Sequence, residues 1–186
     1  MSDTLKETVE NAKTEQLLSL MEVAADMVFI GHGDPNKNEP DVLYKRKPDN
    51  KIIGIEVAGA YYEDSDAKQA WELARGNIKI PEGDFLWRDG GYLKNPQLII
   101  GERILNELVD KANKTYFGCD EYWLCIFLHA ALSTKFKVEQ ELNIFIQDKV
   151  IPESNFDRTF ILAYDPRLGD YCLEIKNDSY LSYIND

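Results

Sequence analysis

The segment EPDVLYKRKPDNKIIGIEVAGAYY, residues 39–62, decides the fold. Two apolar stretches, Val42–Tyr44 and Ile52–Val57, flank a basic turn that contains Pro-Asp-Asn. Val, Ile and Tyr favour strands and Pro-Asp-Asn favours a turn, so the segment predicts a β-hairpin. Each strand carries one acid, because Asp41 begins the first strand and Glu56 lies late in the second.

Glu56 is unusual because it interrupts a sequence of apolar and small residues that is otherwise suited to burial. A carboxylate among apolar neighbours needs a cation, a hydrogen-bond donor or a proton. Two carboxylates on neighbouring strands, Asp41 and Glu56, are able to share a divalent metal ion. The hairpin therefore predicts a metal site.

This arrangement resembles the PD-(D/E)xK phosphodiesterase superfamily, which has the restriction-endonuclease-like fold. Pro40-Asp41 corresponds to the PD half of the motif, and residues 56–58 occupy the (D/E)xK half. The chain departs from the family at Ala58, which stands where the family usually has its lysine. The resemblance covers roughly residues 10–165 and implies a nuclease.

Some branches of this superfamily carry the lysine, or a replacement for it, on the helix that follows the second motif strand. Here Lys68 and Gln69 lie 12 and 13 residues after Glu56, on a helix predicted for residues 63–75. The resemblance therefore implies Lys68 as the substitute and Gln69 as the second choice. A solvated lysine on the helix surface is the alternative interpretation of Lys68.

The resemblance also implies the chemistry of the site. Asp41 and Glu56 would hold Mg²⁺ or Mn²⁺ with the Val57 carbonyl as a third ligand, because hard cations prefer oxygen. Glu15, on a predicted helix ahead of the hairpin, would order a metal-bound water, although an exposed acid on an amphipathic helix is equally compatible. The substrate would be nucleic acid, DNA more than RNA, and the family's double-strand cutters commonly act as homodimers. Four basic residues of the turn are expected to contact backbone phosphates: Lys45, Arg46, Lys47 and Lys51.

Composition sets limits on this interpretation. The 186 residues, 44% of them hydrophobic, suffice for a single nuclease-like domain over residues 1–186. A formal net charge of −12 argues against a nonspecific nucleic-acid coat. That charge and Ala58 favour two alternatives: a catalytically degenerate module that binds a protein or nucleic acid, or an acidic mimic of nucleic acid.

The order of predicted elements indicates an α/β fold, a three-layer α/β/α arrangement of the restriction-endonuclease type around a central mixed sheet. Helices are predicted for residues 4–27, 63–75, 97–116 and 135–150, and further strands for residues 122–128, 159–164 and 171–175. Residues 76–96 predict a long loop. Lys111 is assigned to the solvent-facing side of the third helix, and His32 and Asp34 to a loop beside the hairpin.

Three cysteines with no zinc-ligand spacing predict reduced thiols. The polar N-terminus does not have the character of a signal peptide, and the apolar stretch 122–132 is too short to span a bilayer. We therefore expect a cytoplasmic protein that has no membrane partner.

Overall fold

The computed structural model describes residues 3–61, 96–129, 155–165, 168–175 and 181–183. The predicted helices 63–75 and 135–150, the loop up to residue 95, and both Lys68 and Gln69 lie outside this part of the chain. The described part contains seven strands and two α-helices.

A seven-stranded sheet forms the centre of the molecule, and its strands lie side by side in chain order. The strands are β1 (Met27–His32), β2 (Val42–Arg46), β3 (Ile52–Tyr61), β4 (Glu121–His129), β5 (Arg158–Asp165), β6 (Gly169–Ile175) and β7 (Leu181–Tyr183). The pairs β3–β4 and β4–β5 are parallel and the other neighbours are antiparallel. The prediction of an α/β fold with a mixed sheet is therefore confirmed.

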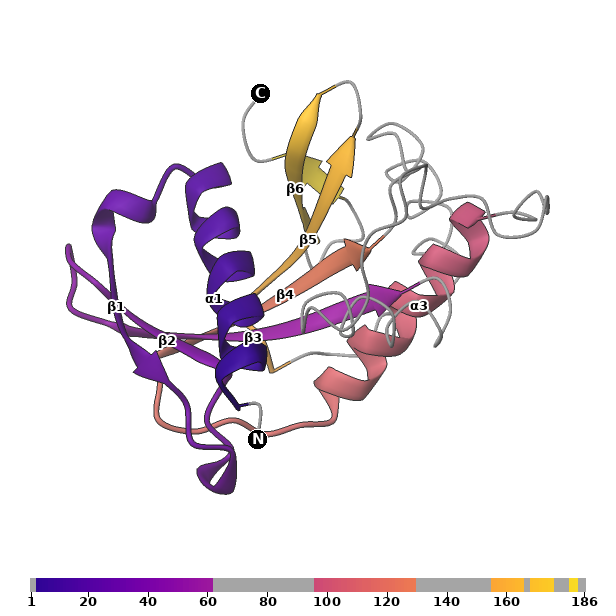
Figure 1. The fold of residues 1–186 in the computed structure, drawn as a ribbon. Coiled ribbons are helices and arrows are strands. Elements are labelled where there is room, and N and C mark those ends of the chain that lie inside the picture. Colours follow the sequence, from indigo (N-terminus) through magenta and orange to yellow (C-terminus); the bar gives the residue numbers. More distant parts are fainter. Residues whose placement is uncertain (1–2, 62–95, 130–154, 166–167, 176–180, 184–186) are drawn as a thin grey trace.

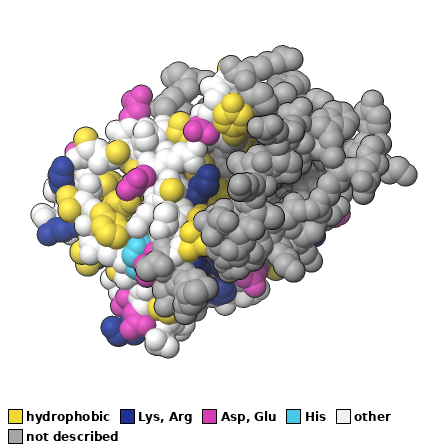
Figure 2. All heavy atoms as spheres, viewed as in Figure 1, with side chains coloured by type: hydrophobic (Ala, Val, Ile, Leu, Met, Phe, Trp, Pro, Cys, Tyr) yellow, Lys and Arg dark blue, Asp and Glu magenta, His cyan; other side chains and the backbone are white. Residues whose placement is uncertain are grey.

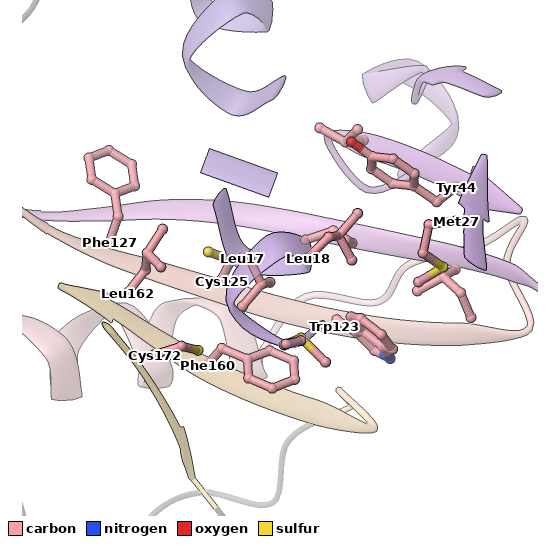
Figure 3. Packing of buried hydrophobic residues seen from close by; sticks show 14 residues of the cluster. Leu17, Leu18, Met27, Tyr44, Trp123, Cys125, Phe127, Phe160, Leu162 and Cys172 are labelled. Atoms are coloured by element: carbon pink, nitrogen blue, oxygen red, sulfur yellow. The ribbon is translucent and has the colours of Figure 1, made fainter. Parts of the chain in front are cut away.

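Two helices cover opposite faces of this sheet (Figure 1). Helix α1 (Asp3–Leu20) packs Leu17 and Leu18 into one core cluster, in which Trp123 and Phe160 are also buried (Figure 3). Helix α3 (Pro96–Ala112) packs Ile104 and Leu108 against the second cluster.

Alternation along the strands explains how one sheet serves both clusters. Cys125 of β4 belongs to the cluster under α1, whereas Leu124 and Ile126 belong to the cluster under α3. Successive strand side chains point to opposite faces, so a strand covered on both sides has a continuous apolar sequence. On β3 the same alternation places Gly54 and Glu56 on the α3 face, since Ile53 and Ile55 lie under α1.

Strand β1 was not predicted from the sequence, and a turn with a short 3-10 helix replaces the end of the predicted helix 4–27. The helix ends at Leu20, and Glu22 then adopts a left-handed conformation with φ 57°. The chain continues through a short 3-10 turn, η1 (Ala24–Asp26), into β1, which pairs with β2. β1 exposes three apolar side chains in sequence, Val28, Phe29 and Ile30.

Neither described helix combines the length and apolar character needed to cross a membrane.

Candidate functional site

The sheet forks where β2 begins. Pairing between β2 and β3 starts at Val42 and Ile55, yet β3 continues to Tyr61. Asp41, immediately before β2, accepts a hydrogen bond from the Val57 N–H through Oδ2 at 2.9 Å. The carboxylate thus occupies the place of a strand carbonyl. Because the N–H and C=O of one strand residue point toward the same neighbour, the Val57 carbonyl also faces this unpaired edge.

Close packing of Pro40 on β3 fixes the position of Asp41. A side chain at Gly54 would bring its Cβ within 2.5 Å of Pro40 Cγ and within 2.6 Å of Cys119 Sγ. Gly54 is therefore required for a steric reason, because its missing side chain lets the proline lie on the strand. The acid that follows Pro40 is held beside the residues that come after Gly54.

Helix α1 contributes a lysine and an acid to this edge. Lys6 Nζ lies 2.9 Å from Asp41 Oδ1 and 2.8 Å from Glu10 Oε1, so its ammonium bridges the two carboxylates. Glu10 is 6% exposed, although it is charged, because it lies on the buried side of α1. The bridge joins α1 to the start of β2.

The two acids differ in their ionisation. Burial and the charge of Asp41 raise the pKa of Glu10 to about 7. Burial also opposes ionisation of Asp41, but the Val57 N–H and Lys6 hold the pKa of Asp41 below its ordinary value. Two neighbouring carboxylates seldom both ionise freely, so Asp41 stays charged and Glu10 takes up the proton first.

Helix α3 supplies the partner of Glu56. Lys111 Nζ lies 2.7 Å from Glu56 Oε1, and the two side chains are only 12% and 8% exposed. Burial alone would lower the pKa of Lys111, but the charges of Glu56 and Asp41 raise it. Lys111 is therefore a buried ammonium within electrostatic range of both motif acids.

Tyr116, which follows α3, lies beside the same pair. Its hydroxyl is buried and has no hydrogen-bond partner among the described residues. Burial and the negative charges of Glu56 and Asp41 raise the pKa of Tyr116. The phenol remains protonated, with its hydroxyl as a hydrogen-bond donor near Glu56.

His32, the last residue of β1, contacts the backbone of Asp41. Its Nδ1 lies 3.2 Å from the carbonyl of Asp41, and its Nε2 lies 3.2 Å from Asn11 Nδ2. A proton on Nδ1 satisfies both contacts, because the carbonyl then accepts and Nε2 accepts from the amide. Asp34 instead caps the 3-10 turn η2 (Pro35–Lys37), where its side chain accepts from the Asn36 N–H. The structure thus brings His32, but not Asp34, into the site.

The predicted residues do not all come together. Asp41, Glu56 and Val57 lie at the fork, whereas Glu15 is exposed on α1 and acts electrostatically on Tyr44. The acid that α1 brings to Asp41 is Glu10.

The basic turn lies at the other end of the hairpin, roughly 13 Å along β3 from Glu56 at about 3.3 Å per residue. Arg46 and Lys51 are held there by Glu121, at 2.6 and 2.9 Å. Lys45 and Lys47 are exposed. Two of the four residues that were predicted to contact phosphates therefore form ion pairs within the chain.

Glu10, Lys6 and Lys111 were missed by the sequence interpretation, and Lys111 was wrongly assigned to the solvent side. The spacing of buried residues along each helix indicates two of them, Glu10 and Lys111. Glu10 continues the buried stripe of α1 at three- and four-residue intervals, through Thr14, Leu17 and Met21. Lys111 likewise continues the stripe of Ile104 and Leu108. A charged residue on an apolar stripe indicates a buried ionic contact.

The side chains at the fork differ from an assembled metal centre. Among the described residues no three His, Cys, Asp or Glu side chains are grouped closely enough to hold a metal. The donors have the right chemistry, however, because carboxylate and carbonyl oxygens suit Mg²⁺ and Mn²⁺. Lys6 already places a positive charge between Asp41 and Glu10, and its side chain is 63% exposed. A hard cation bound by these oxygens would therefore have to displace the Lys6 ammonium.

Comparisons with family models, with curated proteins and with solved structures found no match for this chain. The function has to be inferred from the geometry of the site.

Proposed function

We propose that the chain is a divalent-metal-dependent nuclease of the restriction-endonuclease-like fold, with DNA as its substrate. The observation that supports this most directly is the pair of motif acids at the fork of the sheet. Asp41 accepts a hydrogen bond from the backbone of Val57, the residue next to Glu56, so the Asp41 carboxylate lies beside the backbone of this part of β3. The mixed sheet with a helix on each face is compatible with that fold.

Asp41, Glu56 and the Val57 carbonyl would hold Mg²⁺ or Mn²⁺. The ion would supply a Lewis acid for the scissile phosphate and lower the pKa of a bound water. Glu10 replaces Glu15 in the role of the third acid, and it would orient the attacking water. The exposed Lys45 and Lys47 would contact backbone phosphates, which position a substrate without reading its sequence.

Plasmid nicking tests the proposal. Purified protein with Mn²⁺ should convert supercoiled plasmid to the open circular form, and Asp41→Asn and Glu56→Gln should each lose at least about 100-fold in rate, because each removes a charge that binds the ion. Glu10→Gln and Glu15→Gln form a matched pair on one helix. Glu10→Gln should be slower by about 10-fold or more, whereas Glu15→Gln should cleave at the parental rate.

Equal cutting by the parent and by Glu56→Gln would assign the activity to a contaminant or to another site. Loss of activity in Glu15→Gln with full activity in Glu10→Gln would return the third-acid role to Glu15.

One observation favours a second candidate, a catalytically degenerate module that binds a protein or nucleic acid. Lys6 and Lys111 already neutralise the acids, and Ala58 is buried at 4% exposure where the motif lysine would stand. Thermal unfolding separates the candidates. A metal site predicts that millimolar Mn²⁺ raises the Tm of the parent but not that of Asp41→Asn, whereas the degenerate module predicts no rise in either protein.

A further inference from the structure

We propose that Lys111, on α3, is the positioning residue that replaces the lysine missing at Ala58. It acts through Glu56 and through the field of its ammonium at the scissile phosphate. This inference rests on the proposed nuclease function. The carrying observation is the 2.7 Å contact between Lys111 Nζ and Glu56 Oε1, with both side chains nearly buried.

The topology explains how a residue 55 positions away reaches the motif. Glu56 points to the α3 face of the sheet, and α3 packs on that face through Ile104 and Leu108. Lys111 lies seven residues after Ile104, about two helical turns, and therefore on the same side of the helix. Lys111 therefore lies on the side of α3 that faces the sheet, where its ammonium reaches Glu56.

Ala58 shows why the usual position is not available to a lysine. Its side chain belongs to the core cluster beneath α3 and is 4% exposed. An ammonium there would be buried in that apolar cluster, where an unpaired charge is costly. Lys111 supplies the charge from across the interface, with Glu56 as its partner.

Hydrolysis creates the need for such a charge. The oxygen of water bonds to phosphorus while one ester P–O bond breaks, and the proton of the water ends on the leaving oxygen. Negative charge grows on the phosphate oxygens in between. A fixed ammonium in a water-poor setting stabilises that charge without reorganising.

The test compares Lys111→Met, Lys111→Arg and the control Lys114→Met in the full chain. Lys114 is 47% exposed and pairs with Asp110, so its loss removes a charge near the end of the same helix without removing the contact between Lys111 and Glu56. With Mn²⁺ and plasmid, Lys111→Met should lose about 100-fold in kcat with KM within about threefold, since the lost interaction is made in the transition state. Lys114→Met should match the parent.

Manganese binding provides a second readout that does not depend on cleavage. Lys111→Met should keep a Mn²⁺-induced rise in Tm, because removal of a positive charge does not weaken cation binding by the acids. A merely structural role predicts the opposite, namely that cleavage and the rise in Tm are lost together. That outcome, or cleavage by Lys111→Met within threefold of the parent, would overturn the inference.

Lys111→Met leaves Glu56 as a buried charge without its lysine partner, and this variant is at risk of unfolding. If Lys111→Met does not fold, Lys111→Arg tests the inference. Arginine keeps the positive charge but not the compact ammonium. A folded Lys111→Arg protein with a kcat within about 10-fold of the parent supports the inference, and a kcat about 100-fold or more below the parent overturns it. A parent that neither cleaves nor responds to Mn²⁺ overturns the proposed function, whereas a cleaving parent with an equally active Lys111→Met overturns only the role of Lys111.

Discussion

Lys6 and Lys111 neutralise neighbouring acids, but their surroundings give them different roles. The Lys6 side chain is 63% exposed and bridges Asp41 and Glu10, whereas that of Lys111 is 12% exposed and fixed on Glu56. An exposed ion pair contributes little to stability and exchanges readily with ions from solution. Lys6 is therefore a tethered cation that a divalent ion bound at Asp41 would have to displace.

Replacement of Lys6 tests this exchange. In Lys6→Ala the acids lose their internal competitor, so the Mn²⁺ concentration at half-maximal rise in Tm should fall by roughly 3- to 10-fold. Measurement at pH 8 keeps Glu10 ionised in the parent, since its pKa is about 7. Lys13→Ala, on the same helix, serves as the control and should bind Mn²⁺ as the parent does. A weaker response in Lys6→Ala would show that Lys6 supports the site.

Among the elements, the β2–β3 hairpin is tied to β4 by ion pairs at its turn end. Arg46 contacts both Asp49 and Glu121 at 2.6 Å, and Lys51 contacts Glu121 at 2.9 Å. These contacts join the turn to the beginning of β4, away from the motif acids. They give the basic residues a structural role that does not require nucleic acid.

Acid titration of Glu121→Gln measures that role. The hydrogen bonds from Arg46 hold the pKa of Glu121 below its ordinary value of 4.5. The stabilisation is therefore full above pH 4.5 and is lost as the pH falls through the lower, folded-state pKa. Glu121→Gln should lower the Tm by about 2–4 °C at pH 7, and the difference from the parent should shrink below pH 4. A difference that persists at pH 2 would assign the effect to packing.

The elements also show what sequence patterns are able to predict. β4 and β5 were predictable because strands covered on both faces are continuously apolar, and the hairpin because its turn chemistry is strong. β1 was missed because Val28 prolongs the helical spacing of Leu17, Leu18 and Met21. The break at Glu22 is a left-handed residue that no glycine marks.

For the candidate site, the motif predicts Asp41 and Glu56, because both belong to a local sequence pattern. It could not identify Lys111, whose contact with Glu56 depends on how α3 crosses the sheet. Contacts between distant segments arise from packing, and a charged residue on a buried stripe is their main trace in the sequence. Lys68 and Gln69 stay predictions, since they lie outside the described residues.

At the scale of the whole molecule, a net charge of −12 has to be reconciled with the polyanionic substrate that we propose. Figure 2 shows basic side chains dispersed among acidic ones over the described part of this face, without a continuous basic patch. Ion pairs within the chain engage Arg46 and Lys51. Binding to nucleic acid should then depend on few phosphate contacts.

The salt dependence of DNA binding measures that number. Each phosphate neutralised on duplex DNA contributes about −0.9 to the slope of log K against log salt concentration. If Lys45 and Lys47 are the turn residues that bind, the slope should be shallower than about −3, and Lys45→Gln with Lys47→Gln should flatten it. Lys51→Gln is the matched control, since its partner is Glu121. A slope steeper than about −5 would reveal a basic surface elsewhere.

The fork at the start of β2 has a consequence for mutagenesis. One oxygen of Asp41 accepts a backbone hydrogen bond from β3, so this oxygen has a structural role that is independent of the other oxygen. Truncation to alanine would strip a main-chain amide of its acceptor, and the resulting loss of order would resemble loss of catalysis. Asparagine retains an acceptor oxygen while discarding the charge. Only Asp41→Asn therefore tests the electrostatic role of this side chain without also removing a hydrogen bond at the edge of β3.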